Sequence, residues 1–133
     1  MRIAIDFPPN IDAIKAVFPI RGRGVIFCYG DTIFNPDSVV VPPRLVAHET
    51  VHSMSQGGDP AGWWEKYLTD EEFRLAEEIL AHRAEYRCAL HDANRNQRRQ
   101  ALKLIATRLS GPLYGRMLSL DEAKRVINME IEQ

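Results

Sequence analysis

The sequence predicts an α+β domain with a mostly helical body and a small antiparallel β-sheet. Two observations support this class: helical spacing of apolar residues dominates the chain after residue 43, and short stretches rich in strand-forming residues lie before residue 35. A chain of 133 residues, 45% of them hydrophobic, is long enough for one core and too short for two ordinary domains. We therefore expect one domain over residues 1–133.

The expected sheet comes from the N-terminal part. Arg2–Phe7 alternates polar and apolar residues, and Gly24–Phe34 predicts two short strands that meet at Gly30-Asp31. Between them, Ile11–Phe18 has helical spacing, with Asn10 as a candidate cap. The Arg-Gly-Arg-Gly stretch at 21–24 suggests a phosphate loop, but an ordinary turn is the stronger interpretation.

A second helix is expected over Arg44–Gln56. Pro42-Pro43 suits a helix start, and Gly57-Gly58 stops the helix. Its apolar residues fall at i, i+4 and i+7, so we expect this stripe to pack and the adjacent face to be free for chemistry. The stripe consists of Ala47, Val51 and Met54.

Within this helix, residues 48–52 read H-E-x-x-H. Side chains four apart share one helix face, so the imidazoles of His48 and His52 can face one cation. Glu49 lies beside them and can reach a water molecule at that cation, which makes it the candidate general base. Catalytic zinc keeps three protein ligands and one open position, so we expect Zn²⁺ and a third ligand from another element.

The third ligand is expected on a long helix from about Asp70 to about Asp92, capped by Thr69 or Asp70. Two apolar stripes run along it: one of Leu75, Ile79, Tyr86 and Leu90, the other of Phe73, Leu80, Ala84 and Cys88. Glu78 and Glu85 lie between the stripes, opposite the solvated face of Arg83 and Arg87.

Buried carboxylates need a cation. We favour Glu78 as the zinc ligand, with Glu85 and then Glu77 as substitutes, and Glu85 is also a candidate to support a ligand from behind. The alternative is that Arg74, four residues before Glu78, simply pairs with it.

His48–His52 followed by Glu78–Ala81 resembles the gluzincin class of zinc metallopeptidases, in which a downstream E-x-x-A helix supplies the third ligand. The chain is similar to minimal single-domain members, including small peptidase-like proteins of bacteriophages and bacteria. Weaker likenesses in the flanking stretches 29–36, 63–68 and 73–75 extend the resemblance over the larger part of the chain.

The resemblance implies a zincin-like domain in which His48, His52 and Glu78 hold zinc, and Glu49 acts as base and proton shuttle. It also implies a small sheet packed on the zinc helix, with a strand edge that aligns an extended peptide. One departure is His82, at the position where thermolysin-like members have an acidic residue that orients a zinc histidine. That role must pass to Glu85 or to a backbone carbonyl.

The metzincin pattern is excluded, because it requires glycine at Ser55 and histidine at Gly58.

Hydrolysis also needs a donor for the oxyanion, and the candidates are Tyr114, His91 and His82. Tyr114 lies in a Gly-Pro loop over residues 111–115 that could close over the cleft, although a buried loop anchor is the more favoured interpretation. Of Trp63 and Trp64, at least one is expected in the core and the other could line the cleft.

The remaining sequence features do not indicate a further functional site. A net charge of −1 gives no overall attraction to nucleic acid or membrane, and no signal-peptide pattern or transmembrane run is visible. Cys28 and Cys88 are expected to be free thiols, which favours a reducing cytoplasm. Further helices are expected over Arg95–Leu109 and Leu120–Ile131.

The first of these helices is basic, but without interleaved aromatic residues a solvated face is a better interpretation than a nucleic-acid surface. Its basic residues are Arg98, Arg99, Lys103 and Arg108.

We therefore expect a zinc-dependent peptidase that acts on a peptide or protein substrate, without a membrane or nucleic-acid partner. Two alternatives stay open: a non-catalytic zinc-binding regulatory or peptide-binding module, and a basic-helix nucleic-acid binder in which H-E-x-x-H is coincidental. The sequence does not indicate the oligomeric state.

Overall fold

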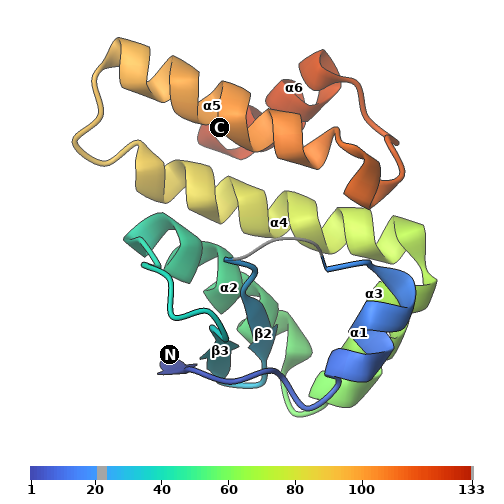
Figure 1. Ribbon diagram of the computed structural model, residues 1–133. Coiled ribbons are helices and arrows are strands. Elements are labelled where there is room, and N and C mark those ends of the chain that lie inside the picture. Colours follow the sequence, from blue (N-terminus) through green and yellow to red (C-terminus); the bar gives the residue numbers. More distant parts are fainter. Residues whose placement is uncertain (21–23, 133) are drawn as a thin grey trace.

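The computed structural model describes residues 1–20 and 24–132 and is mostly helical, with one small sheet (Figure 1). The α+β class is confirmed. The strands are β1 (Arg2–Ala4), β2 (Phe27–Tyr29) and β3 (Thr32–Phe34). The helices are α1 (Ile11–Val17), α2 (Pro43–Gln56), α3 (Pro60–Thr69), α4 (Glu71–Ala89), α5 (Arg95–Leu109), the 3₁₀ turn η1 (Pro112–Tyr114) and α6 (Leu120–Glu132).

The sheet has the order β1-β3-β2 and is mixed, so the expected antiparallel sheet is wrong in part. β2 and β3 form the expected antiparallel hairpin, with Gly30 at φ 62° in its turn. β1 pairs with β3 in parallel, Ile3 opposite Ile33. The chain leaves β1, forms α1 and β2, and only then returns as β3, and a connection of that length allows the parallel orientation that a tight hairpin forbids.

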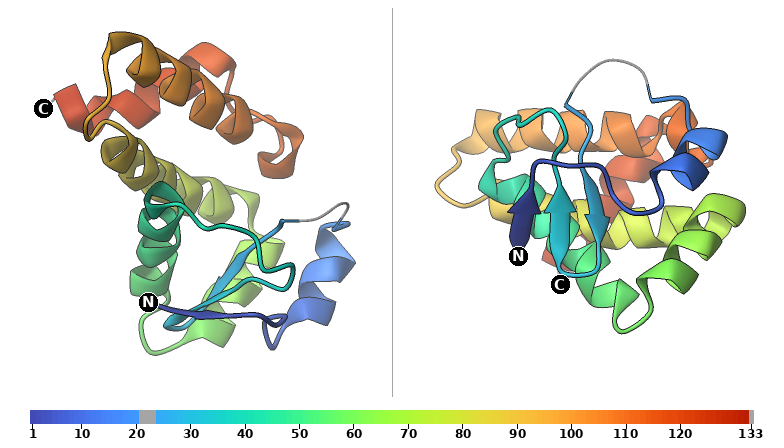
Figure 2. Two further views of the ribbon diagram at one scale, coloured as in Figure 1. Left: turned by 60° about the vertical axis from the view of Figure 1, so that its left-hand side comes forward. Right: turned by 60° about the horizontal axis from the view of Figure 1, so that its bottom comes forward.

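The elements form three layers with α4 as the middle layer, as Figures 1 and 2 show. α2 packs on one side of α4 and contacts the sheet at strand β2, whereas α5 and α6 cover the other side of α4. The sheet-side core consists of Ile14, Phe27, Trp63, Trp64 and Tyr67. The C-terminal core consists of Tyr86, Ile105, Ala106, Leu109, Tyr114, Ala123 and Ile127. Both tryptophans are therefore core residues.

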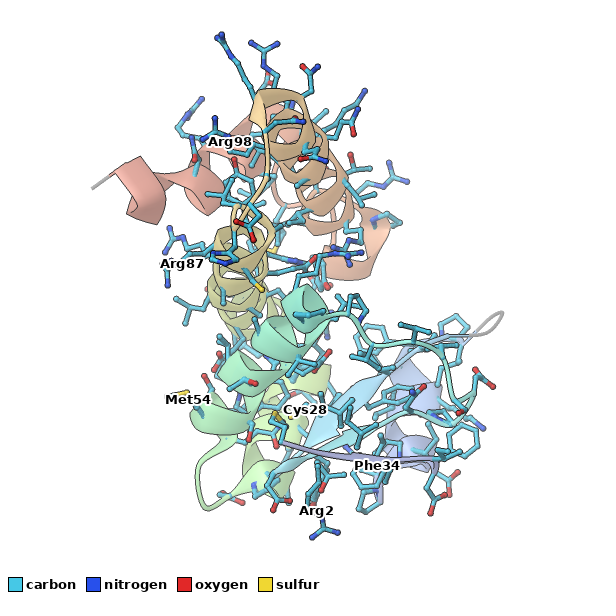
Figure 3. All side chains as sticks on the ribbon, turned by 90° about the vertical axis from the view of Figure 1, so that its left-hand side faces the viewer. Arg2, Cys28, Phe34, Met54, Arg87 and Arg98 are labelled. Carbon is cyan, nitrogen blue, oxygen red and sulfur yellow. The ribbon has the colours of Figure 1, made fainter. Side chains whose placement is uncertain are left out.

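The faces of α2 differ from the expectation. Its buried residues are His48, Glu49, His52 and Gln56, not the apolar stripe. Met54 is 78% exposed and points outward from the helix (Figure 3), and Ala47 and Val51 are only half-buried. The polar face turns inward because α4 and β2 both contact it and offer partners for its polar atoms.

On α4, the predicted cap and the buried carboxylates are confirmed. The Asp70 side chain accepts from the amides of Glu72 and Phe73, while Glu78 and Glu85 are 3% and 0% exposed. The helix ends at Ala89, three residues before the expected end at Asp92. The second apolar stripe is wrong as a buried flank, because Leu80 is 46% exposed and α2 contacts the carboxylate face instead.

The other helices follow the sequence closely. α5 has the predicted bounds, and an Asn94–Gln97 capping box starts it. Its apolar residues Ile105 and Leu109 are buried. The Asn10 side chain, however, makes no cap hydrogen bond at α1. Of the predicted turn at 21–24, residues 21–23 lie outside the described residues.

Candidate metal centre

Three side chains from α2 and α4 converge on one point. His48 Nε2 lies 3.2 Å from His52 Nε2 and 3.2 Å from Glu78 Oε2, while His52 Nε2 lies 2.8 Å from Glu78 Oε1. All three side chains are buried, at 3–7% exposure. α2 supplies the histidines at adjacent turns of one face, and α4 crosses that face with Glu78.

The donor set fits a zinc ion. Imidazole nitrogens and carboxylate oxygens bind zinc at about 2.0–2.2 Å, so ligands in a tetrahedral shell lie about 3.3 Å from one another. The 3.2 Å between the two histidine nitrogens approaches that spacing, and each nitrogen lies 2.8–3.2 Å from one of the two Glu78 oxygens. Two histidines and one glutamate leave a fourth position open, as catalytic zinc sites do.

The charges of these groups hold the three together. Burial by itself would lower the pKa of His48, but Glu78 and Glu85 outweigh it and raise that pKa to about 10. Burial also opposes charging of His52, but the same Glu78 carboxylate raises its pKa. Burial would raise the pKa of Glu78, yet the two histidines hold it well below its usual range. The arrangement is therefore a compact set of opposite charges in the interior.

Two tyrosines hold the Glu78 carboxylate. Tyr67 on α3 donates its hydroxyl to Oε1 at 3.0 Å, and Tyr114 in η1 donates to Oε2 at 3.1 Å. The alternative partner Arg74 instead donates to the carbonyls of Tyr67 and Leu68. Sequence reasoning did not assign Tyr67 a role, and nothing in its local pattern distinguishes it from a core tyrosine.

Glu85 supports the site from behind. Its Oε1 contacts His48 Nδ1 at 2.9 Å and His82 Nδ1 at 3.3 Å, and its Oε2 accepts from Arg108. Burial would raise the pKa of Glu85, but these partners lower it. An ionised carboxylate only accepts, so His48 donates to Glu85 through Nδ1, and Nε2 is the nitrogen that faces His52 and Glu78 and would bind a metal once its proton is lost. Glu85 thus takes the position in which the sequence expected an orienting group.

His48, His82 and Glu85 also lie close enough to suggest a second cation site. This group is a poor one, because the Arg108 guanidinium already contacts Glu85 and would repel a cation there. In addition, His48 presents its Nδ1 to this group and its Nε2 to the first. The group of His48, His52 and Glu78 is therefore the better site.

Glu49 faces the cavity beside these ligands. It is 7% exposed, and burial raises its pKa against the opposing effect of His48 and His52. Glu49 and the three ligands are among the residues that line a cavity of about 340 Å³, and the aromatic residues Phe27, Trp63 and Trp64 also line it and form its aromatic wall. The site can therefore hold a ligand that presents a polar group to the histidines and an apolar group to the aromatic wall.

The strand edge next to the site is partly occupied. The Cys28 carbonyl of β2 accepts from Gln56 Nε2 at 2.9 Å and from Trp64 Nε1 at 3.0 Å. An extended peptide therefore cannot use this carbonyl, which modifies the peptide-aligning edge that the resemblance implies.

Of the remaining candidates, His91 and Glu77 do not face the histidine ligands, whereas His82 lies beside them. His91 is largely exposed and faces Asp92, so it is not an oxyanion donor here. Glu77 accepts from Trp63 Nε1 at 3.1 Å rather than facing the histidines. His82 is buried, with Nε2 at 3.7 Å from Glu78 Oε2. Cys28 and Cys88 are free thiols, as predicted.

Comparison with protein-family models, curated proteins and solved structures finds no match to this chain. Among the described residues, no helix combines the length and apolarity needed to cross a bilayer.

Proposed function

We propose that this chain is a minimal, zincin-like metallopeptidase of the gluzincin type, which hydrolyses peptide bonds with Zn²⁺ held by His48, His52 and Glu78. The observation that carries the proposal is the close approach of their donor atoms at a cavity that Glu49 also lines: His48 Nε2 lies 3.2 Å from His52 Nε2, and each of these nitrogens lies 2.8–3.2 Å from a different oxygen of Glu78. Bound zinc supplies Lewis acidity, which polarises a carbonyl oxygen and acidifies a water molecule.

The protein's own side chains then perform the proton transfers. Glu49 takes a proton from the attacking water as its oxygen bonds to the peptide carbonyl carbon. The same carboxyl returns the proton to the amine nitrogen as the C–N bond breaks. The raised pKa of Glu49 suits the first step, because a base with a higher pKa binds the proton more strongly.

Tyr114 is the proposed oxyanion donor. Tyr114 lines the cavity, and burial, followed by Glu78, keeps the pKa of its hydroxyl well above the ordinary value, so the hydroxyl remains a donor. It also anchors η1 by donating to Glu78. The anchor and donor roles alternate, because the single O–H of Tyr114 can donate either to Glu78 or to a substrate oxygen.

The proposed partner is a peptide or protein substrate that places an apolar side chain against the aromatic wall; neither nucleic acid nor membrane is part of the proposal. A reducing cytoplasm is the proposed setting, supported by the two free cysteines. The second candidate function is a non-catalytic zinc-binding module. It is favoured by the occupied Cys28 carbonyl, because that group cannot align a substrate strand.

Glu49→Gln separates the two functions. We expect about one zinc per chain in wild type and variant, and a loss of peptide hydrolysis of about 10²–10⁴-fold in the variant, because the general base is removed and the ligands are kept. Metal analysis and cleavage of a fluorogenic peptide library measure these quantities.

Glu65→Gln on the exposed face of α3 makes the same charge change and should keep full activity. Zinc-loaded wild type that is as inert as Glu49→Gln would instead support the non-catalytic module.

A further inference from the structure

The basic helix α5 reaches the metal centre through one side chain. Arg108 comes from the far side of α4 relative to α2 and donates through a terminal guanidinium nitrogen to Glu85 Oε2. The other oxygen of Glu85 contacts His48 Nδ1 at 2.9 Å. Arg108, Glu85 and His48 therefore form a continuous chain of contacts across three helices.

Glu85 depends on this arginine. Its side chain is 0% exposed, whereas that of Arg108 is 42% exposed, so the guanidinium brings a solvated charge to a fully buried carboxylate. A buried carboxylate without a cation is costly and free to turn toward any other donor. With Arg108 on one oxygen and the histidines on the other, the carboxylate plane has one orientation.

We propose that Arg108 is a positioning residue of the metal centre: it fixes Glu85, which in turn fixes the ring of His48 with Nε2 toward His52 and Glu78. This inference rests on the proposed function, because it assigns His48 to a metal. It also makes α5 part of the site, through Arg108, whereas Arg99 of the same helix is exposed.

The position of the carboxylate explains why an arginine is needed. In this chain the residue four positions after Glu78 is His82. The carboxylate that orients His48 is Glu85, seven positions after Glu78. At 100° per residue this places Glu85 on the same face of α4, two turns along, where α5 packs behind it. His82 uses the same Oε1 as His48, so the remaining oxygen is left for a cation from α5.

The test compares the zinc affinities of variants by competition with a chromogenic chelator. Arg108→Met keeps much of the side-chain stem and removes the charge, and we expect it to weaken zinc binding by about 10-fold or more. Arg108→Lys keeps a charge without the planar fork and should be intermediate. Arg99→Met removes an exposed charge from the same helix and should bind zinc as wild type does.

A double-mutant cycle decides whether Arg108 acts through Glu85. Glu85→Gln alone should weaken zinc binding by about 10–100-fold, and Arg108→Met should then cause no further loss, because its partner is already changed. Thermal unfolding of each zinc-free variant reports the structural role of the contact separately.

Several outcomes overturn the inference: unchanged zinc affinity in Arg108→Met, losses that multiply independently in the double variant, or coupling in the unfolding of zinc-free protein without coupling in zinc affinity. Failure of the proposed function is recognised separately. Wild type that takes up no zinc refutes the metal site in the first titration, whereas wild type that binds zinc but cleaves nothing refutes only the peptidase and leaves the cycle valid.

Discussion

The two helix pairs of this protein bury opposite kinds of side chain. α5 and α6 bury aliphatic side chains, such as Ile105, Leu109 and Ile127, and expose charges such as Arg99 and Arg125. α2 and α4 bury histidines and glutamates against each other and leave Met54 and Leu80 exposed. Figure 3 shows the consequence at the surface, with Met54 and Arg98 both pointing outward on different layers.

The difference shows where apolar periodicity predicts helix faces and where it does not. Around the C-terminal core, removal of apolar surface from water drives packing, so the apolar stripe and the buried face coincide. Between α2 and α4, burial of polar groups is compensated by hydrogen bonds and opposite charges. The apolar stripe of a helix does not predict this kind of buried face. The comparison can be tested by perturbing each side separately.

The largest expected effect is in the C-terminal core. Leu109→Ala should lower the free energy of unfolding by about 2–5 kcal/mol, because it opens a cavity at a side chain with 0% exposure. Urea unfolding of the zinc-free protein measures this change. Zinc affinity should stay within a few-fold of wild type, and a parallel collapse of both quantities would show that the two regions are not separable.

Metal should stabilise the polar side of the comparison. At zinc concentrations about 100-fold above the dissociation constant, binding should add about 2.7 kcal/mol to wild-type stability, and a chelator should reverse it. His52→Ala should remove this increment, whereas Leu109→Ala should retain it. The measurement is urea unfolding with and without zinc, and equal increments in wild type and His52→Ala would contradict the ligand assignment.

The last turn of α2 allows a comparison within one helix. Gln56 is buried, accepts from the Gly30 amide at 2.6 Å and donates to the Cys28 carbonyl, so Gln56→Ala should cost about 1–3 kcal/mol. Met54→Ala should change stability by less than about 0.5 kcal/mol, because the side chain is 78% exposed. Thermal unfolding of both variants checks the ranking, and a costlier Met54→Ala would restore the apolar stripe as the packed face.

The smallest expected effect is a loss of stability at alkaline pH. Burial, followed by the charges of Glu49 and Asp31, raises the pKa of Cys28 to about 12. Below about pH 9 the thiol is protonated in both states; above it the unfolded chain ionises first, so stability falls as pH rises toward the folded pKa. Between about pH 9 and 11, wild type should lose on the order of 1 kcal/mol more than Cys28→Ala in urea unfolding. Parallel pH profiles would exclude this contribution.

Much of the centre was accessible to sequence reasoning because it depends on local spacing. The i, i+4 histidines and the position of Glu78 between two apolar stripes follow from helix geometry, and the structure brings these residues together. Tyr67 and Arg108 were missed because they reach the site from other helices by tertiary packing. Gln56 was missed because its partners, Gly30 and Cys28, are distant in sequence.

By itself the sequence determined most of the helical segments, including their approximate ends, the hairpin at Gly30, and a pair of histidines on one helix face, because each depends on residues within a few positions of one another. Only the tertiary structure decided that β1 runs parallel to β3, that the polar face of α2 turns inward, and that Glu85 receives an arginine from α5. Those features depend on which surfaces pack together. The free energy of that packing comes from contacts between elements far apart in the chain, so the local sequence does not determine it.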